Sequence, residues 1–174
     1  MNVSLKDPKL APHLVPKPLW GKSAFRLFGR RTLWKQMRTD ALEVAHHTCE
    51  ICGDTPSPIC GDPLNCHEVW VYDDKRGKAT LESLRIQCSK CDAVVHMGRT
   101  VAHGGRDAAI SQLCKINGLS TKQAEKLYVR AMATWAKRSK KKWQIAVAQH
   151  LLEWYPQLIQ LVELKPSRSP SKPS

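Results

Sequence analysis

The chain has 174 residues, enough for one compact domain or for a small domain with long helical additions. It contains no run of about 18 apolar residues, and its first residues lack the apolar stretch of a secretory signal, so we expect a cytoplasmic protein that does not enter a membrane. The formal net charge of +13 favours a polyanionic partner, with nucleic acid first and an anionic membrane surface second.

The positive charge is distributed unevenly along the chain. Residues 49–92 contain eight acidic and five basic side chains and carry a net −3, whereas the remainder carries +16. The positive field therefore comes from the flanks and not from the cysteine-rich middle. A solvated basic surface without a polyanionic partner is the alternative interpretation.

The N-terminal part of the chain predicts an arm followed by a helix. Residues 1–18 contain four prolines and predict an extended arm. The pattern from 32 to 46 predicts a helix. Its expected apolar face consists of Leu33, Met37, Ala41 and Val44.

The cysteine-rich segment predicts two strands and a short helix. Residues 64–72 alternate with the period of a strand, which places Cys66 and His67 on opposite faces. The elements expected next are a turn, a returning strand and a short helix, at 73–78, 80–88 and 89–99.

The C-terminal part predicts a helical extension over 103–156. Residues 106–118 are expected to form a helix that ends at Asn117-Gly118, and Ser120 with Gln123 forms a capping box for a second amphipathic helix. That helix ends in the basic run "KRSKKK". Residues 157–174 are expected to form a disordered basic tail rich in proline and serine.

Two C-x-x-C pairs are the strongest chemical signal in the sequence. Cys49 with Cys52 and Cys88 with Cys91 each offer two thiolates from one tight turn. Zinc prefers four such ligands in a tetrahedron, and a chain without a secretory signal is not expected to form disulfides. We therefore predict a structural Zn²⁺ held by these four cysteines, rather than four reduced buried thiols or a thioredoxin-like redox site.

A second set of ligand-type residues lies beside this knuckle. Asp92 and His96 are one helical turn apart and project from the same face of the short helix. A hairpin lying across that helix would bring Cys66 and His67 over this pair. A carboxylate and an imidazole one turn apart can share a divalent ion, with a strand histidine opposite.

This order of motifs resembles the HNH, or His-Me finger, endonuclease family of bacteria and phages, in its zinc-stapled form. The similarity is carried by "PLWGKS", "CEICG", "CHEVWVYDD", the second C-x-x-C, "HMGR" and "INGLSTKQAE", and it covers roughly residues 16–145. The resemblance implies an α+β fold, a small treble-clef ββα-metal module with flanking helices. It places that module, with its preceding helix, at residues 19–102.

The same resemblance implies residue roles. His67 would act as the general base, and Ser83 stands where the family often has an asparagine that orients this histidine. Asp92 and His96 would hold Mg²⁺ or another divalent ion. Cys66 stands in the position of the strand's metal ligand, although a thiol is a poor ligand for hard ions.

The favoured function is therefore a metal-dependent endonuclease that hydrolyses phosphodiester bonds in DNA. The alternative is a catalytically inactive zinc module that binds nucleic acid or a partner protein, for example in phage–host conflict, or a structural part of a larger assembly. The residues expected to contact nucleic acid are cationic: Arg30, Arg31, Lys137, Arg138, Lys140, Lys141 and Lys142.

Overall fold

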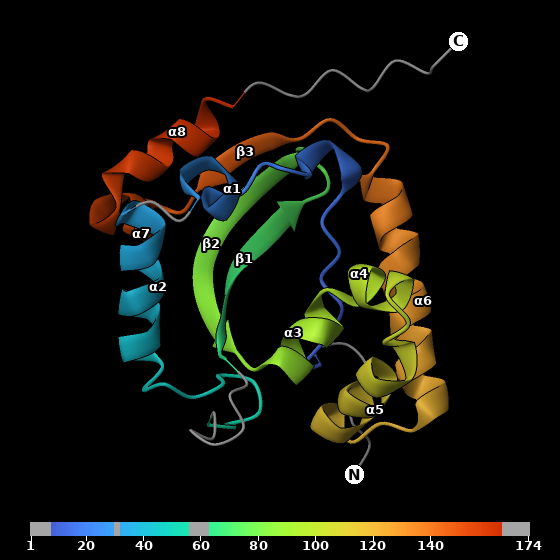
Figure 1. Cartoon of the computed structure of the whole chain (residues 1–174). Helices are drawn as coiled ribbons and strands as arrows, with labels where there is room; N and C mark the ends of the chain where they lie inside the picture. Colours follow the sequence, from blue (N-terminus) through green and yellow to red (C-terminus); the bar gives the residue numbers. More distant parts are fainter. Residues whose placement is uncertain (1–7, 30–31, 56–62, 165–174) are drawn as a thin grey trace. The chain divides into compact units, whose positions relative to one another are not determined.

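The computed structural model describes residues 8–29, 32–55 and 63–164, and it is a mixed α+β protein (Figure 1). The α+β class expected from the sequence is confirmed. In the N-terminal half the elements are η1 (Lys17–Leu19), α1 (Ala24–Phe28), α2 (Thr32–Val44), β1 (Asn65–Asp73), β2 (Lys78–Gln87) and α3 (Ser89–Val95). In the C-terminal half they are α4 (Met97–Ala102), α5 (Arg106–Asn117), α6 (Thr121–Arg138), β3 (Gln144–Val147), α7 (Gln149–Trp154), η2 (Pro156–Leu158) and α8 (Ile159–Val162).

The chain divides into two compact units, each built from three separate stretches of sequence. The first unit comprises 1–14, 40–67 and 85–135, and the second comprises 15–39, 68–84 and 136–174. These units do not follow the consecutive segments expected from the sequence, because β1 and β2 each contribute residues to both.

The first unit has a core formed by the end of β2 and by α3, α5 and α6. Val94, Val95 and Leu113 are fully buried there, and α3 packs against α5 and α4 (Figure 1). Leu10, from the expected N-terminal arm, belongs to this core and is 1% exposed. The amide of Leu10 donates to the Asn117 side chain at 3.1 Å, and that side chain donates back to the Leu10 carbonyl at 2.8 Å.

The second unit is organised by the outer part of the sheet. The sheet order is β1-β2-β3, and β3 pairs in parallel with β2, with Ala79 opposite Ile145. The turn between β1 and β2 requires Gly77, whose φ is +64° and whose added Cβ would lie 2.8 Å from the Lys142 carbonyl. Its own carbonyl accepts the Gln144 amide at 2.8 Å, which aligns the start of β3.

Several expectations for the C-terminal part and for α2 were wrong. Residues 103–156 are not purely helical, because they include β3, whose partner strand lies more than 60 residues earlier. The disorder expected from residue 157 onward is wrong for 157–164, because α8 packs against β3 (Figure 1) and Leu158 and Leu161 are fully buried; the rest of the expected tail lies outside the described residues. In α2, Val44 is 78% exposed and the buried side is marked by Trp34 and Met37.

Other local predictions agree with the structure. The helix expected at 106–118 is α5, and Gly118 ends it in the left-handed conformation, with φ +62°. The capping box forms as expected: the Ser120 amide donates to Gln123 at 2.9 Å, and the Gln123 amide donates to the Ser120 hydroxyl at 3.4 Å. The helix expected at 89–99 is divided at His96 into α3 and α4.

Candidate metal centres

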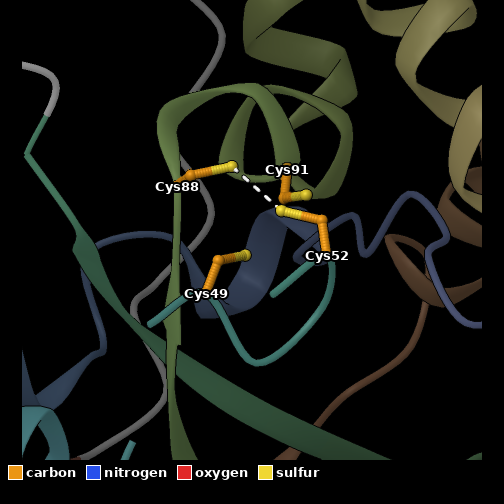
Figure 2. Close-up of side chains that lie close together, drawn as sticks. All are labelled: Cys49, Cys52, Cys88 and Cys91. Atoms are coloured by element: carbon orange, nitrogen blue, oxygen red, sulfur yellow. Dashed lines mark hydrogen bonds between the residues drawn. The ribbon is translucent and has the colours of Figure 1, made fainter. Parts of the chain in front are cut away.

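The four paired cysteines converge on one point in the first unit. Cys49 and Cys52 come from the turn that follows α2, and Cys88 and Cys91 lie at the start of α3 (Figure 2). Their sulfur atoms all lie within 4.8 Å of one another. These four cysteines form a cluster that could hold a metal ion.

The spacing of the sulfurs tests whether zinc fits this cluster. Two sulfurs bound at about 2.3 Å to one tetrahedral zinc lie about 3.8 Å apart. The sulfurs of Cys52 and Cys88 are 3.7 Å apart (Figure 2), and both thiols are free. The cluster therefore has the size and the donor chemistry of a four-thiolate zinc site.

The first cysteine turn is held by backbone hydrogen bonds. The Gly53 amide donates to the Cys49 carbonyl at 2.7 Å, and Gly53 has a φ of +75°, which a side chain would disfavour. The turn is also tied to the end of β2, because the Glu50 amide donates to the Ile86 carbonyl and the Ile86 amide donates to the Glu50 carboxylate. Both halves of the cluster are thus fixed by neighbouring backbone.

Hydrogen bonds and burial shift the pKa values of three thiols in the cluster in different directions. The Cys91 thiol and nearby backbone amides donate to Cys49, which lowers the pKa of Cys49 to about 4. The pKa of Cys91 is raised because its proton is held by Cys49, and burial raises the pKa of Cys52 to about 11. A bound cation would stabilise the thiolate forms of Cys52 and Cys91, so metal binding here should release protons.

A second cluster lies in the same unit and consists of His67, Asp92 and His96. One ligand-type atom from each lies within 4.8 Å of the others. His67 Nδ1 is 3.2 Å from His96 Nε2, and that Nε2 is 3.6 Å from Asp92 Oδ1. Two ligands about 2.1 Å from one ion are separated by about 3.0 to 3.4 Å for octahedral to tetrahedral angles. The separation of the two histidine nitrogens lies within this range, and the His96–Asp92 separation of 3.6 Å lies slightly above it, so the two imidazoles and the carboxylate could hold a divalent transition metal or Mg²⁺ after a small movement of Asp92.

The surroundings of this cluster keep its histidines neutral. Burial, together with the nearby His96, His13 and Arg85, lowers the pKa of His67 to about 3. Burial also lowers the pKa of His96, although Asp92 acts in the opposite direction. Neutral imidazoles have a free lone pair, which is the form that binds metal ions.

The structure places the other expected site residues away from these two groups. Cys66 is half-buried against the core of the first unit and joins neither cluster of the described residues, because it alternates with His67 along β1. Ser83 lies in β2 and does not orient His67: Nδ1 of that ring faces His96, and Nε2 has no hydrogen-bond partner among the residues that the structure describes.

The expected nucleic-acid residues divide into two groups, apart from Arg30 and Arg31, which lie outside the described residues. Arg138 donates to Asp74 in a two-pronged ion pair, with its shortest bond at 2.7 Å, and its guanidinium stacks 4.5 Å from the centre of the Tyr72 ring. Lys141 also donates to Asp74. The exposed cations of the run are Lys137, Lys140 and Lys142.

Three features were missed at the sequence level. Lys122, Lys126 and Arg130 are exposed at every fourth position of α6, a spacing that could have been read from the sequence. The ring of His13 lies edge-on to His67, with ring centres 6.3 Å apart. Gln87 donates to Asp92 at 2.8 Å, and no sequence signal points to that contact.

Comparison with known protein families, curated proteins and solved structures finds no match to this chain. Across 8–29, 32–55 and 63–164, no helix is both long and apolar enough to span a membrane.

Proposed function

We propose that this protein is a metal-dependent endonuclease that hydrolyses phosphodiester bonds in DNA. The observation that carries the proposal is the meeting of His67, Asp92 and His96 within 4.8 Å, beside a four-thiol cluster. The proposed architecture is a zinc-stapled ββα module of the His-Me finger type, formed by β1, β2 and α3. Its structural ion is Zn²⁺ on Cys49, Cys52, Cys88 and Cys91.

The chemistry follows from the second cluster. A divalent ion bound there would activate a water molecule and stabilise the negative charge that develops on the phosphate. His96 and Asp92 would hold that ion from one face of α3. Arg99, whose side chain is 68% exposed and whose Nη2 is 3.6 Å from Asp92 Oδ2, would attract the phosphate toward it.

His67 has two candidate roles in this proposal. As a general base it would take a proton from the attacking water. As a third ligand it would present Nδ1 to the ion, which the 3.2 Å distance to His96 Nε2 supports. We favour the ligand role because the ring is 7% exposed and uncharged, which suits a ligand better than a base that must reach water.

Exposed cations support DNA as the partner. Lys137, Lys140 and Lys142 follow the end of α6 in the second unit, and Lys122, Lys126 and Arg130 line an exposed face of α6 in the first. Neither set is held in an ion pair by the described residues. Such side chains bind the phosphate backbone without reading sequence.

A second candidate function is an inactive module that binds DNA or a partner protein. It is favoured by the lack of any hydrogen-bond partner for His67 Nε2 among the described residues, because no side chain there orients the ring through that nitrogen. The two functions share the zinc cluster and the cationic surface, and they differ in whether a second ion acts on a phosphate.

Plasmid cleavage by the full-length, zinc-loaded protein tests the proposal. We expect nicking with Mg²⁺, Mn²⁺ or Ni²⁺, and loss of most of this activity in His96→Ala and in His67→Ala, because each variant removes a ligand of the ion that activates the water. His150→Ala, which removes an exposed histidine from α7, is the matched control and should cleave like the wild type. All variants should retain one zinc per chain.

Two results would contradict the nuclease proposal. Equal cleavage by His96→Ala and the wild type would show that the activity does not arise at this cluster. DNA retardation without cleavage under any of these ions would support the inactive binding module.

A further inference from the structure

Gln87 is a fully buried polar residue that the chemistry above does not use. It is the last residue of β2, and its side chain is 0% exposed. Its amide nitrogen donates to Asp92 Oδ1 at 2.8 Å, while its Oε1 has no partner among the residues that the structure describes. An apolar residue of similar size would avoid the cost of burying an unpaired carbonyl.

The position of this hydrogen bond links the two clusters. Gln87 directly precedes Cys88, and Asp92 directly follows Cys91. The bond therefore joins two residues that are each covalently attached to a cysteine of the four-thiol cluster. Ordering that cluster orders both ends of the bond.

The bond also selects one oxygen of the carboxylate. Gln87 donates to Oδ1, which is the oxygen that faces His96 Nε2 at 3.6 Å, whereas Oδ2 faces Arg99 at 3.6 Å. Without the amide, Arg99 would be the remaining charged partner, and the carboxylate could turn toward it. The amide thus opposes rotation of Asp92 away from the two histidines.

We propose that Gln87 is a positioning residue of the second metal centre: it fixes the Asp92 carboxylate for ion binding and couples that centre to the four-thiol cluster. The inference rests on the proposed function only in requiring that His67, Asp92 and His96 bind an ion. Hydrogen-bonding partners that orient a metal ligand typically change metal affinity by about 10- to 100-fold when removed.

The test measures binding of Mn²⁺ to the zinc-loaded full chain by electron paramagnetic resonance and calorimetry. Gln87→Leu keeps the volume and removes the donor. Gln112→Leu is the matched control, because Gln112 also donates an amide hydrogen to a cluster residue, the Cys91 sulfur, at 3.4 Å.

We expect the two variants to weaken different metal sites. Gln87→Leu should bind Mn²⁺ about 10- to 100-fold more weakly, with one zinc per chain and an undiminished melting temperature. Gln112→Leu should lose zinc more readily to a chelator, but in its zinc-loaded form it should bind Mn²⁺ as the wild type does, because it keeps the hydrogen bond from Gln87 to Asp92. A purely structural role for Gln87 would instead lower the melting temperature and the zinc content together.

Three outcomes would overturn the inference. Wild-type Mn²⁺ affinity in Gln87→Leu would show that the amide does not position Asp92. Parallel loss of zinc, stability and Mn²⁺ binding in that variant would assign Gln87 to the fold alone. A wild type that binds no second ion would overturn the proposed function itself, and this inference with it.

Discussion

The two units of the molecule differ in charge and in what stabilises them. The segments of the first unit contain all seven cysteines and 10 Lys and Arg against 9 Asp and Glu. Those of the second contain 18 Lys and Arg against 6 Asp and Glu, and five of the six tryptophans. The nearly neutral unit carries both candidate metal centres, and the strongly basic unit carries neither among its described residues.

The buried carboxylate of Glu68 in the second unit is satisfied differently from the buried side chains of His67 and Gln87 in the first. In the second unit, Glu68 is 8% exposed and accepts hydrogen bonds from the Phe25 amide at 2.9 Å and the Trp70 indole at 3.1 Å. In the first unit, buried His67 and Gln87 each retain an unpartnered atom among the described residues. The first unit thus leaves unpartnered atoms at and beside the cluster of His67, Asp92 and His96, which could hold an ion, whereas the second satisfies the Glu68 carboxylate with its own side chains and backbone.

The largest expected effect is that of disrupting the four-thiol cluster. Cys88→Ser should abolish stoichiometric zinc and unfold the first unit, because structural zinc in small modules contributes about 10 kcal/mol or more to folding. Hydrogen exchange should then accelerate across α3 and α5, while tryptophan emission, which comes mainly from the second unit, changes less.

Cys114→Ser is the control for this experiment. Cys114 lies in α5, half-buried and outside the cluster, so this variant should keep its zinc and its exchange protection. If Cys88→Ser lost protection from hydrogen exchange equally in both units, the two units would not differ in their dependence on the four-thiol cluster.

An intermediate effect is expected when the basic run is neutralised. Replacing Lys137, Lys140 and Lys142 with glutamine should weaken DNA binding and reduce the slope of log affinity against log salt by about 3, close to one unit per lost phosphate contact. Fluorescence titrations at several salt concentrations measure this slope.

Arg138 and Lys141, which both bind Asp74, provide a comparison for this prediction. Arg138→Gln with Lys141→Gln should change the salt slope less but lower stability by about 1 kcal/mol, the size expected for a partly exposed charge network. The prediction would be contradicted if the Arg138 and Lys141 substitutions changed the salt slope as much per residue as the Lys137, Lys140 and Lys142 substitutions. The ion pairs with Asp74 would then not keep Arg138 and Lys141 from binding DNA.

The smallest expected effect is a pH dependence from Glu68. Burial raises the pKa of this carboxyl above its ordinary value of 4.5, although its hydrogen bonds act against the shift. The native state therefore binds more protons than the unfolded state between 4.5 and the raised pKa, so the Glu68 contribution to stability falls as pH rises through that window.

Glu68→Gln should remove this dependence, because a glutamine keeps an acceptor for the Phe25 amide but does not ionise. Relative to the wild type, its melting temperature should rise between about pH 4 and pH 8, because only the wild type loses stability as Glu68 ionises. Glu82→Gln, at an exposed position in β2, is the control. A constant difference between Glu68→Gln and the wild type across this range would contradict the prediction.

Local patterns in the sequence were sufficient for several elements of the fold and for one cluster. The spacing of the two C-x-x-C pairs predicted which thiols would meet, because each pair needs only one tight turn. The Ser120–Gln123 capping box and the stop at Gly118 were predictable for the same reason. The i, i+4 spacing of Asp92 and His96 likewise placed both side chains on one face of a helix, since this relation depends on helical periodicity alone.

Contacts between distant segments could not be predicted in this way. β3 is four residues long, and its strand character depends on pairing with Lys78–Leu81. Arg138 and Lys141 were expected to contact nucleic acid, but both bind Asp74, which lies more than 60 residues earlier in the chain. Ser83 was assigned by analogy to a position in a motif, and the ring contacts of His67 show a different neighbour.

The sequence by itself determined the donor set of the thiol cluster, the class of the fold and the excess of positive charge in the flanks. Only the tertiary structure decided that His67 faces His96, that Gln87 holds Asp92, and that each unit is assembled from three separate segments. The physical reason is that periodicity and turn chemistry act over a few residues. The neighbours of a buried side chain are instead set by which remote segments pack together.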